Sequence, residues 1–184
     1  VDGSQTSRVS IFDGSAAVAA TGAKVTVPSN SGTRVRAGLA PEAVTVLPGT
    51  PVLAPETPRF VVWRGPGTAV DLRWAPSERA TRYRVQLARD ELFVDRVEDQ
   101  LTDQPAARVL LTSEEPLRLR VIAFDERGLQ SRPSKSVELG VVVVGGAPTQ
   151  QGVVRHRAPA PLEVKLPSGW TLQLGGKPVL LPLA

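Results

Sequence analysis

Arginines gather in two stretches of this sequence that alternate like β-strands. Arg82 and Arg84 lie two residues apart in the first stretch, and Arg118 and Arg120 lie two apart in the second. In a strand, residues two apart point to the same face. A planar guanidinium group can hydrogen-bond a carboxylate, phosphate or sulfate in a bidentate way. If the two strands are neighbours, these side chains and Phe124 form a face that could dock an anionic surface or an acidic protein.

A second interpretation of this face stays open. Charged side chains are common on the solvated face of an antiparallel sheet. Four arginines without nearby acids would repel one another, but the carboxylates of Asp95, Glu98 or Glu138 could neutralise them. The sequence therefore predicts either a partner-binding face or an ordinary solvated face at these positions.

Side chains that could catalyse a reaction are few. The single histidine, His156, lies between two arginines in a Pro- and Gly-rich stretch, and no Gly-x-Ser-x-Gly elbow or Gly-x-x-x-x-Gly-Lys loop occurs. Cysteines are absent, which excludes thiolate metal sites, cysteine nucleophiles and disulfides. The acids from Asp90 to Asp103 match no calcium-loop spacing and are interpreted as a charged loop and edge strand. We predict no catalytic, cofactor or metal site and no enzyme activity.

Two tryptophans are candidates for contact with a glycan. Trp63 and Trp170 lie near the ends of predicted strands, where an aromatic ring could form a platform for a sugar. Trp74, by contrast, falls on the apolar face of its strand and is expected in the core. Packing in a core or an interface is the other interpretation of Trp63 and Trp170, since buried aromatic side chains contribute strongly to core stability.

The elements that must position these residues are β-strands. Residues 59–144 contain about seven alternating runs, a number typical of an immunoglobulin-like sandwich. In such a sandwich the third and sixth strands are neighbours in one sheet, which would join the two arginine stretches. The predicted strands are 60–63, 69–75, 82–88, 93–97, 107–111, 117–125 and 136–144.

The first 40 residues read as a smaller unit. Residues 7–38 alternate with period two and carry turn signals at Asp13-Gly14, Thr21-Gly22 and 29–32, which predicts a small β-meander. Its apolar side chains are mostly valine and alanine, so this sheet needs a covering layer. We expect the strands in residues 161–184 to pack on it.

The chain as a whole is predicted to be all-β, because Pro (17) and Gly (16) are abundant and long helical patterns are missing. The net charge of +4, set against 18 acidic residues, does not favour nucleic acid as a partner. No apolar run reaches the roughly 18 residues of a membrane-spanning helix. The expected order is a β-unit at 1–40, a Pro-rich linker at 41–58, the sandwich at 59–144, a second linker at 145–160 and C-terminal strands at 161–184.

One pattern in residues 7–38 combines a Val-rich hairpin with a Gly-x-x-Val-x-x-Gly strand, at Val9, Ile11, Gly14, Val18, Gly32, Val35 and Gly38. It resembles the C-terminal part of a FecR-type domain. The next block has Trp74, a third strand over 80–90 and an Asp-x-x-Gly-Leu-x-Ser loop after the sixth strand. This block is similar to the fibronectin type III-like module that often follows FecR domains.

The resemblance implies a periplasmic or other extracytoplasmic location in a Gram-negative bacterium. It also implies a non-enzymatic scaffold or interaction role in envelope assembly or signalling. The partners would be other envelope proteins, an upstream part of the same polypeptide, or peptidoglycan or another anionic glycan. Two alternatives stay open: a peptidoglycan- or polysaccharide-binding accessory module, and a fragment of a carbohydrate-active enzyme.

Overall fold

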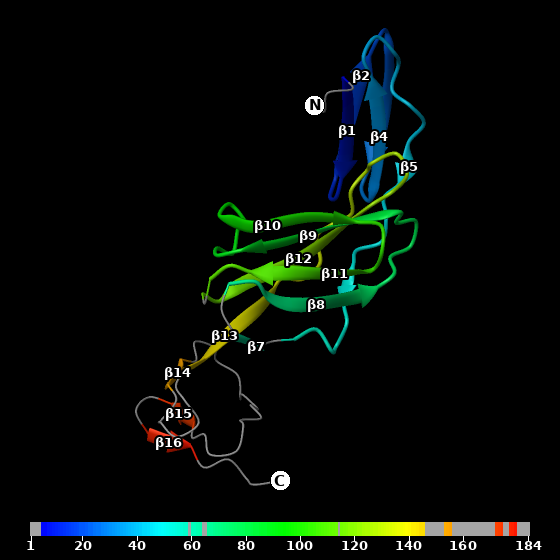
Figure 1. Cartoon of the computed structure of the whole chain (residues 1–184). Helices are drawn as coiled ribbons and strands as arrows, with labels where there is room; N and C mark the ends of the chain where they lie inside the picture. Colours follow the sequence, from blue (N-terminus) through cyan, green and yellow to red (C-terminus); the bar gives the residue numbers. More distant parts are fainter. Residues whose placement is uncertain are drawn as a thin grey trace.

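Strands provide all the regular structure of the described chain (Figure 1). The structure is a computed structural model that describes residues 5–58, 60–63, 66–113, 115–145, 153–155, 172–174 and 177–179. Within these ranges it contains strands and turns but no helix, which confirms the all-β prediction. A membrane-spanning helix is accordingly not found in this part of the chain.

A β-sandwich forms the largest part of the described structure (Figure 1). Its two sheets are antiparallel apart from one strand pair and have the arrangement of an immunoglobulin-like sandwich. The third and sixth predicted strands are neighbours as expected. One sheet has the order β11 (Ala106–Leu111), β8 (Thr68–Ala75) and β6 (Val52–Leu53). The other has the order β10 (Arg96–Thr102), β9 (Arg82–Ala88), β12 (Leu117–Phe124) and β13 (Val137–Gly145), with β7 (Phe60–Trp63) parallel to β13 and β14 (Val153–Arg155) antiparallel to it.

The core of the sandwich follows from the alternation in its strands. In β8, Val70, Leu72 and Trp74 are buried, whereas the residues between them are exposed. Trp74 meets Tyr83 of β9 edge-on, with 5.4 Å between ring centroids, a geometry that adds to the energy of burial. The core is completed by Val85, Leu87, Val109, Leu111, Leu117, Leu119, Val121, Ala123, Leu139 and Val141.

One strand of the sandwich lies later in the chain than predicted. The sequence pattern placed a strand at 93–97, but β10 begins at Arg96 and runs to Thr102. Residues 90–95 form a turn instead, because the side chain of Asp90 accepts hydrogen bonds from two backbone amides of that segment. A bulge between Arg96 and Glu98 then adjusts the register of β10 on β9.

The N-terminal unit, which we define as residues 5–46, is built from nested hairpins. β1 (Thr6–Ile11) pairs with β4 (Ser31–Arg36), and β4 pairs with β5 (Thr45–Val46). The hairpin of β2 (Ser15–Ala20) and β3 (Ala23–Pro28) lies between them in sequence, and β3 contacts β4. The predicted hairpin across Thr21-Gly22 is confirmed, but the meander is wrong in pairing β1 with β2, because β1 pairs with β4. Thr21 and Gly22 both have positive φ, as the tight turn between β2 and β3 requires.

The described C-terminal strands do not cover the N-terminal unit as predicted. β15 (Leu172–Leu174) pairs with β16 (Lys177–Val179). Figure 1 shows both at the opposite end of the sandwich from β1, β2 and β4. The loop between β12 and β13 contacts the N-terminal unit instead, through Leu129, which is fully buried and packs on Gly32. The predicted strand at 162–166 lies outside the described residues.

Candidate functional site

The predicted arginine face exists as one surface of the β9–β12 pair. Residues two apart in each strand share a face, and the antiparallel register decides which of them are neighbours. This confirms that the two arginine stretches meet, while their use in docking stays a prediction. The register places Arg82 opposite Phe124, Arg84 opposite Ile122, Gln86 opposite Arg120 and Ala88 opposite Arg118.

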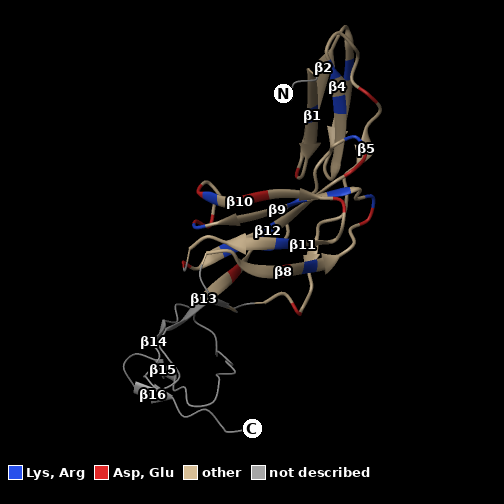
Figure 2. Ribbon diagram, in the orientation of Figure 1, with Lys and Arg blue, Asp and Glu red and all other residues tan. Residues whose placement is uncertain are grey.

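Acidic residues on and after β10 neutralise part of this face. Arg84 Nε lies 2.7 Å from Asp99 Oδ1, and Arg82 Nε lies 3.3 Å from Asp103 Oδ1. Figure 2 shows acidic positions of β10 beside basic positions of β9. At the other end, Arg118 Nη1 reaches Glu91 Oε1 at 4.0 Å. Of the three acids that the sequence suggested, Glu138 lies opposite Arg118 in the register of β12 and β13. The ion pairs of the face use Asp99, Asp103 and Glu91 instead.

A polar chain crosses the middle of the face. Arg120 donates from Nε to Gln86 Oε1 over 2.8 Å, and Gln86 donates from Nε2 to Asp99 Oδ2 over 3.1 Å. Gln86 is 2% exposed, so both ends of its amide need partners. Burial lowers the pKa of Arg120, with a smaller effect from the charge of Arg96.

The loop between β9 and β10 closes over one end of the face. Phe93 is 2% exposed, and its ring centroid lies 4.1 Å from Arg120 Cζ, a cation–π contact. Phe93 has a φ of 60°, a left-handed conformation that is rare for an aromatic residue. The side chains on either side of it, Leu92 and Val94, are both highly exposed.

Asp90 fixes this loop. Its Oδ2 accepts a hydrogen bond from Asp95 N over 2.6 Å, and its Oδ1 accepts one from Val94 N over 3.0 Å. These hydrogen bonds, the one from Asp95 first, lower the pKa of Asp90. Hydrogen bonds to Glu115 and then Asp95 raise the pKa of Arg89. Part of the acidic stretch therefore serves to shape a turn.

The Asp-x-x-Gly-Leu-x-Ser motif after β12 forms a compact turn. Asp125 Oδ1 accepts hydrogen bonds from Arg127 N over 2.9 Å and from Leu129 N over 2.8 Å. Gly128 N donates to Asp125 O over 3.0 Å, and Gly128 has a φ of 77°, which favours glycine. The turn holds Leu129 in a fixed direction, away from the sandwich core.

Leu129 reaches the N-terminal unit and is fully buried there. A Cβ added at Gly32 of β4 would lie 3.1 Å from Leu129 Cδ1 and 2.9 Å from Leu47 Cδ2, so these side chains pack directly on the glycine backbone. Leu47 is itself 2% exposed. The Leu129 contact was not predicted. Its only sequence signal is an apolar residue inside a polar loop.

Polar contacts surround this buried contact. Arg132 Nη2 donates to Phe12 O and to Asp13 Oδ1, each over 2.6 Å. Arg8 Nε donates to Arg127 O over 2.9 Å. We call this set of contacts, centred on Leu129 and Arg132, the joint. It connects β1 and β4 to the loop between β12 and β13.

Two serines allow the same loop to leave the sheet. β13 pairs with β12 only up to Leu119, so the later amides of β12 need other acceptors. Ser134 Oγ accepts from Val121 N, and Ser131 Oγ accepts from Ala123 N, each over 3.0 Å. These two backbone amides of β12 are therefore hydrogen-bonded although β13 does not pair with this end of the strand.

The Pro-rich segment 41–58 also connects the two parts. Arg34 Nε donates to Glu42 Oε1 over 2.9 Å, and this hydrogen bond is the main cause of the lowered pKa of Glu42. Thr33 Oγ1 donates to Glu42 O over 2.7 Å. Further along, Gly49 N donates to Glu78 O over 2.9 Å. The segment thus lies along the protein surface, hydrogen-bonded to both parts.

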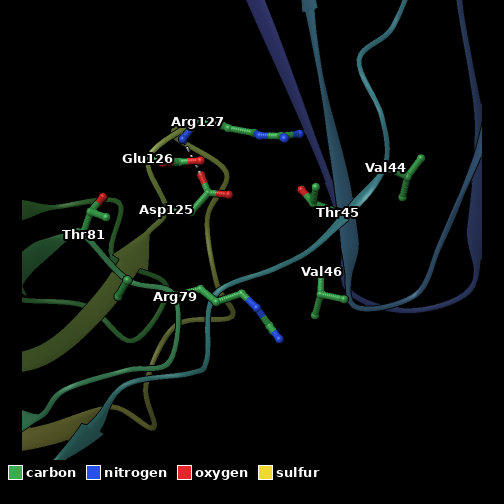
Figure 3. Close-up of a pocket in the computed structure, with 9 residues that line it drawn as sticks. Val44, Thr45, Val46, Arg79, Thr81, Asp125, Glu126 and Arg127 are labelled. Atoms are coloured by element: carbon green, nitrogen blue, oxygen red, sulfur yellow. Dashed lines mark hydrogen bonds between the residues drawn. The ribbon is translucent and has the colours of Figure 1, made fainter.

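Two hollows flank the turn at Asp125–Arg127. The first, of about 670 Å³, lies between that turn, residues 44–46 and residues 79–81. Figure 3 shows Arg79 extending toward Val46 across it. The second, of about 560 Å³, contains the predicted site residues Arg82, Arg84 and Phe124, and we call it the basic groove. The remaining residues of the basic groove are Arg8, Arg34, Thr81, Leu101 and residues 125–128.

The other candidates are only partly placed. Trp63 ends β7, but the structure does not describe its side chain, and Trp170 and His156 lie outside the described residues. Glycan contact at the two tryptophans therefore stays a prediction. Among the described residues, no group of three or more His, Cys, Asp and Glu side chains could hold a metal ion.

Comparison with protein-family models and with curated proteins gave no match. Among solved structures, FN3tt is 20% identical over 52% of this chain and 98% of its own length, with a TM-score of 0.37. The Clostridium thermocellum CbhA fibronectin(III)-like modules are 18% identical over 50% of this chain and 94% of theirs, at a TM-score of 0.36. A β-1,2-glucanase from Parabacteroides distasonis is 17% identical, at a TM-score of 0.39, over 66% of this chain but 16% of the enzyme. The strand order itself establishes the sandwich.

Proposed function

We propose that this chain is a non-enzymatic scaffold and interaction module of a bacterial cell-envelope protein. In this proposal, a FecR-like β-unit and a fibronectin type III-like sandwich are held in one fixed orientation, and partners bind to the surface that they share. The observation that carries the proposal is the joint, where Leu129 is buried against Gly32 and Arg132 binds two successive residues of the turn between β1 and β2.

A fixed orientation is not the usual behaviour of neighbouring domains. Domains joined by a simple linker are expected to move relative to each other unless their interface is large and apolar. Here two connections that are distant in sequence restrict such motion. One is the Pro-rich segment, bound through Glu42 and Gly49, and the other is the loop that carries Leu129. Bending would have to break both.

Distance measurements between spin labels test this proposal. The chain has no cysteines, so cysteines introduced at the exposed positions Thr26 of β3 and Leu110 of β11 can be labelled selectively. A single narrow distance distribution is expected for the full chain. Leu129→Ser should broaden it, whereas Leu92→Ser, at an exposed position far from the joint, should not. A broad distribution in the unmodified chain would contradict a fixed scaffold.

The envelope location is supported by the resemblance of residues 7–38 to FecR-type domains. Fractionation of cells that express the complete gene product tests it. The product is expected in the periplasmic or membrane-associated fraction, and a product confined to the cytoplasmic fraction would contradict the proposal.

A further inference from the structure

We propose that the basic groove binds an acidic peptide segment that carries an apolar side chain between its carboxylates. This inference rests on the proposed function, because it names the kind of partner that an interaction module would dock. The groove has a volume of about 560 Å³, within the range of established ligand sites.

The charge of the groove favours an anionic ligand. Five arginines line it, against two carboxylates, those of Asp125 and Glu126. One of these carboxylates is engaged in the turn, since Asp125 Oδ1 accepts two backbone hydrogen bonds. The arginines come from both parts of the molecule and are Arg8, Arg34, Arg82, Arg84 and Arg127.

Ion pairs within the described residues involve Arg34, Arg82 and Arg84, but they leave other N–H donors of these guanidinium groups available. Arg34 pairs with Glu42, Arg82 with Asp103 and Arg84 with Asp99, and each of these ion pairs is made through Nε. A guanidinium group has five N–H donors, so one ion pair through Nε does not exhaust it. The side chains of Arg82 and Arg84 are 57% and 43% exposed, and a ligand can reach both.

The apolar part of the groove favours a peptide over a polysaccharide. Leu101 is 53% exposed, and it lies opposite Arg84 in the register of β10 and β9. Phe124 lies in the same groove, opposite Arg82. A peptide can place a leucine or valine on this surface between two glutamates, whereas a uronate chain has no such side chain. Burial of apolar area would add to the ionic attraction.

The groove is a composite of the two parts of the molecule. Arg8 and Arg34 come from β1 and β4, whereas Arg82, Arg84 and Phe124 come from the sandwich. The distance between the two walls therefore depends on the joint. A change that loosens the joint should weaken binding even when it touches no residue of the groove.

Fluorescence anisotropy of the full chain tests the inference. The probe is the fluorescein-labelled peptide Gly-Glu-Leu-Glu-Gly-Glu-Leu-Glu, compared with its Gln-for-Glu version and with a labelled oligogalacturonate. The Glu peptide should bind, its affinity should fall with increasing salt, and the other two probes should bind at least about tenfold more weakly. Equal binding of the Gln peptide, or preferred binding of the oligogalacturonate, would overturn the assignment to an acidic peptide.

Variants locate the binding site. Arg82→Gln combined with Arg84→Gln should reduce affinity for the Glu peptide about tenfold or more, since two charge contacts are lost. Arg108→Gln is the matched control, because Arg108 is 66% exposed, pairs with Asp71 at 2.8 Å and lies on the other sheet. It should change affinity less than about twofold. Circular dichroism checks that each variant is folded.

A third variant tests the composite nature of the groove. Arg132→Gln should weaken binding although Arg132 does not line the groove. If Arg108→Gln lowers the affinity for the Glu peptide as much as the Arg82→Gln/Arg84→Gln double variant does, the assignment of the binding site to the basic groove is overturned. If the Glu peptide does not bind while the spin-label distance stays narrow, the groove assignment fails but the fixed scaffold stands.

Discussion

Arg132 and Asp13, which are 119 positions apart in sequence, form an ion pair of 2.6 Å between Nη2 and Oδ1. The same nitrogen donates to the carbonyl oxygen of Phe12, and the guanidinium lies 5.5 Å from the Phe12 ring centroid. One side chain of the sandwich thus holds the turn between β1 and β2 through three kinds of contact. This relationship makes the stability of the N-terminal unit depend on the sandwich.

Removal of Arg132 should loosen the N-terminal unit selectively. We expect Arg132→Gln to lower the free energy of opening of β1 and β4 by about 1 kcal/mol, the usual value of a lost hydrogen bond. Asp13→Asn should cost less than about 0.5 kcal/mol, because Asp13 is highly exposed and exposed ion pairs contribute little. Amide hydrogen exchange measures both. An equal loss of protection in β8 and β9 would contradict a local effect.

Leu129 should stabilise the N-terminal unit as strongly as a core residue stabilises the sandwich. Leu129→Ala is expected to lower the free energy of opening of the N-terminal unit by about 2–5 kcal/mol, the range for a buried leucine. The loss of amide protection should centre on β1 and β4. Leu119→Ala, at an equally buried position in the sandwich core, is the matched comparison and should affect β9 and β12 instead. Identical patterns from the two variants would contradict the role of Leu129 in the joint.

Gly128 has both a positive φ and a close neighbour at the position of a Cβ, whereas Gly14 has only the positive φ. Gly128 has a φ of 77°, and a Cβ there would lie 2.6 Å from Arg8 Nε. Gly14 has a φ of 72° but nothing within 4 Å of an added Cβ. Gly14→Ala should therefore cost only the conformational strain, about 1 kcal/mol, and Gly128→Ala should cost more.

Thermal unfolding measures this difference, and the double variant Arg8→Ala/Gly128→Ala identifies its cause. If the clash with Arg8 produces the extra cost, the two substitutions should couple favourably. Strict additivity would mean that Arg8 moves aside without cost.

The loop between β9 and β10 should open in acid. The pKa of Asp90 is lowered in the folded chain by its hydrogen bonds from Asp95 and Val94. A depressed carboxyl pKa contributes stability that is present above the unfolded value, near about 3.9. That stability is lost as the pH falls through the folded value. We therefore expect the amides of Val94 and Asp95 to lose exchange protection below about pH 4.

Substitution of the carboxylate provides the control for this pH effect. Asp90→Asn should remove the acid transition at those two amides and lower their protection at neutral pH, because one of the two accepting oxygens becomes a donor. If the variant keeps the acid transition, the transition does not come from Asp90.

The long buried strands could be predicted from the sequence, because one face of each alternates strictly. Trp74 and Leu72 mark the inner face of β8, and Val85 and Leu87 mark that of β9. This alternation also determines the outer face, so the meeting of Arg84 with the second arginine stretch followed from the sandwich topology. The identity of the neutralising acids did not follow, because Asp99 reaches Arg84 only through the register of β10, which a bulge adjusts.

The hairpin of β2 and β3 could be predicted from its turn, but the pairing of β1 with β4 and the joint could not. The turns after Ile11 and after Pro28 have sequences that suit hairpins, but neither turn joins two paired strands. β1 pairs with β4, and β2 pairs with β3. Leu129 gave no indication of its contact, because an apolar residue in a loop can pack in many directions. Two features determine the direction of the Leu129 side chain. The hydrogen bonds to Asp125 are local in sequence, but the space left by the missing side chain of Gly32 comes from a residue 97 positions away.

The parallel pairing of β7 with β13 has a mechanical consequence. β7 lies near the start of the sandwich and β13 near its end, and their paired residues run from 60 to 63 and from 140 to 143 in the same direction. A tensile load that pulls the start of β7 away from the end of β13 acts along the strands and therefore shears all of their hydrogen bonds together. Strands loaded at one end of a hairpin separate one bond at a time, which needs less force. Tension applied along the chain would therefore load the β7–β13 pair in shear.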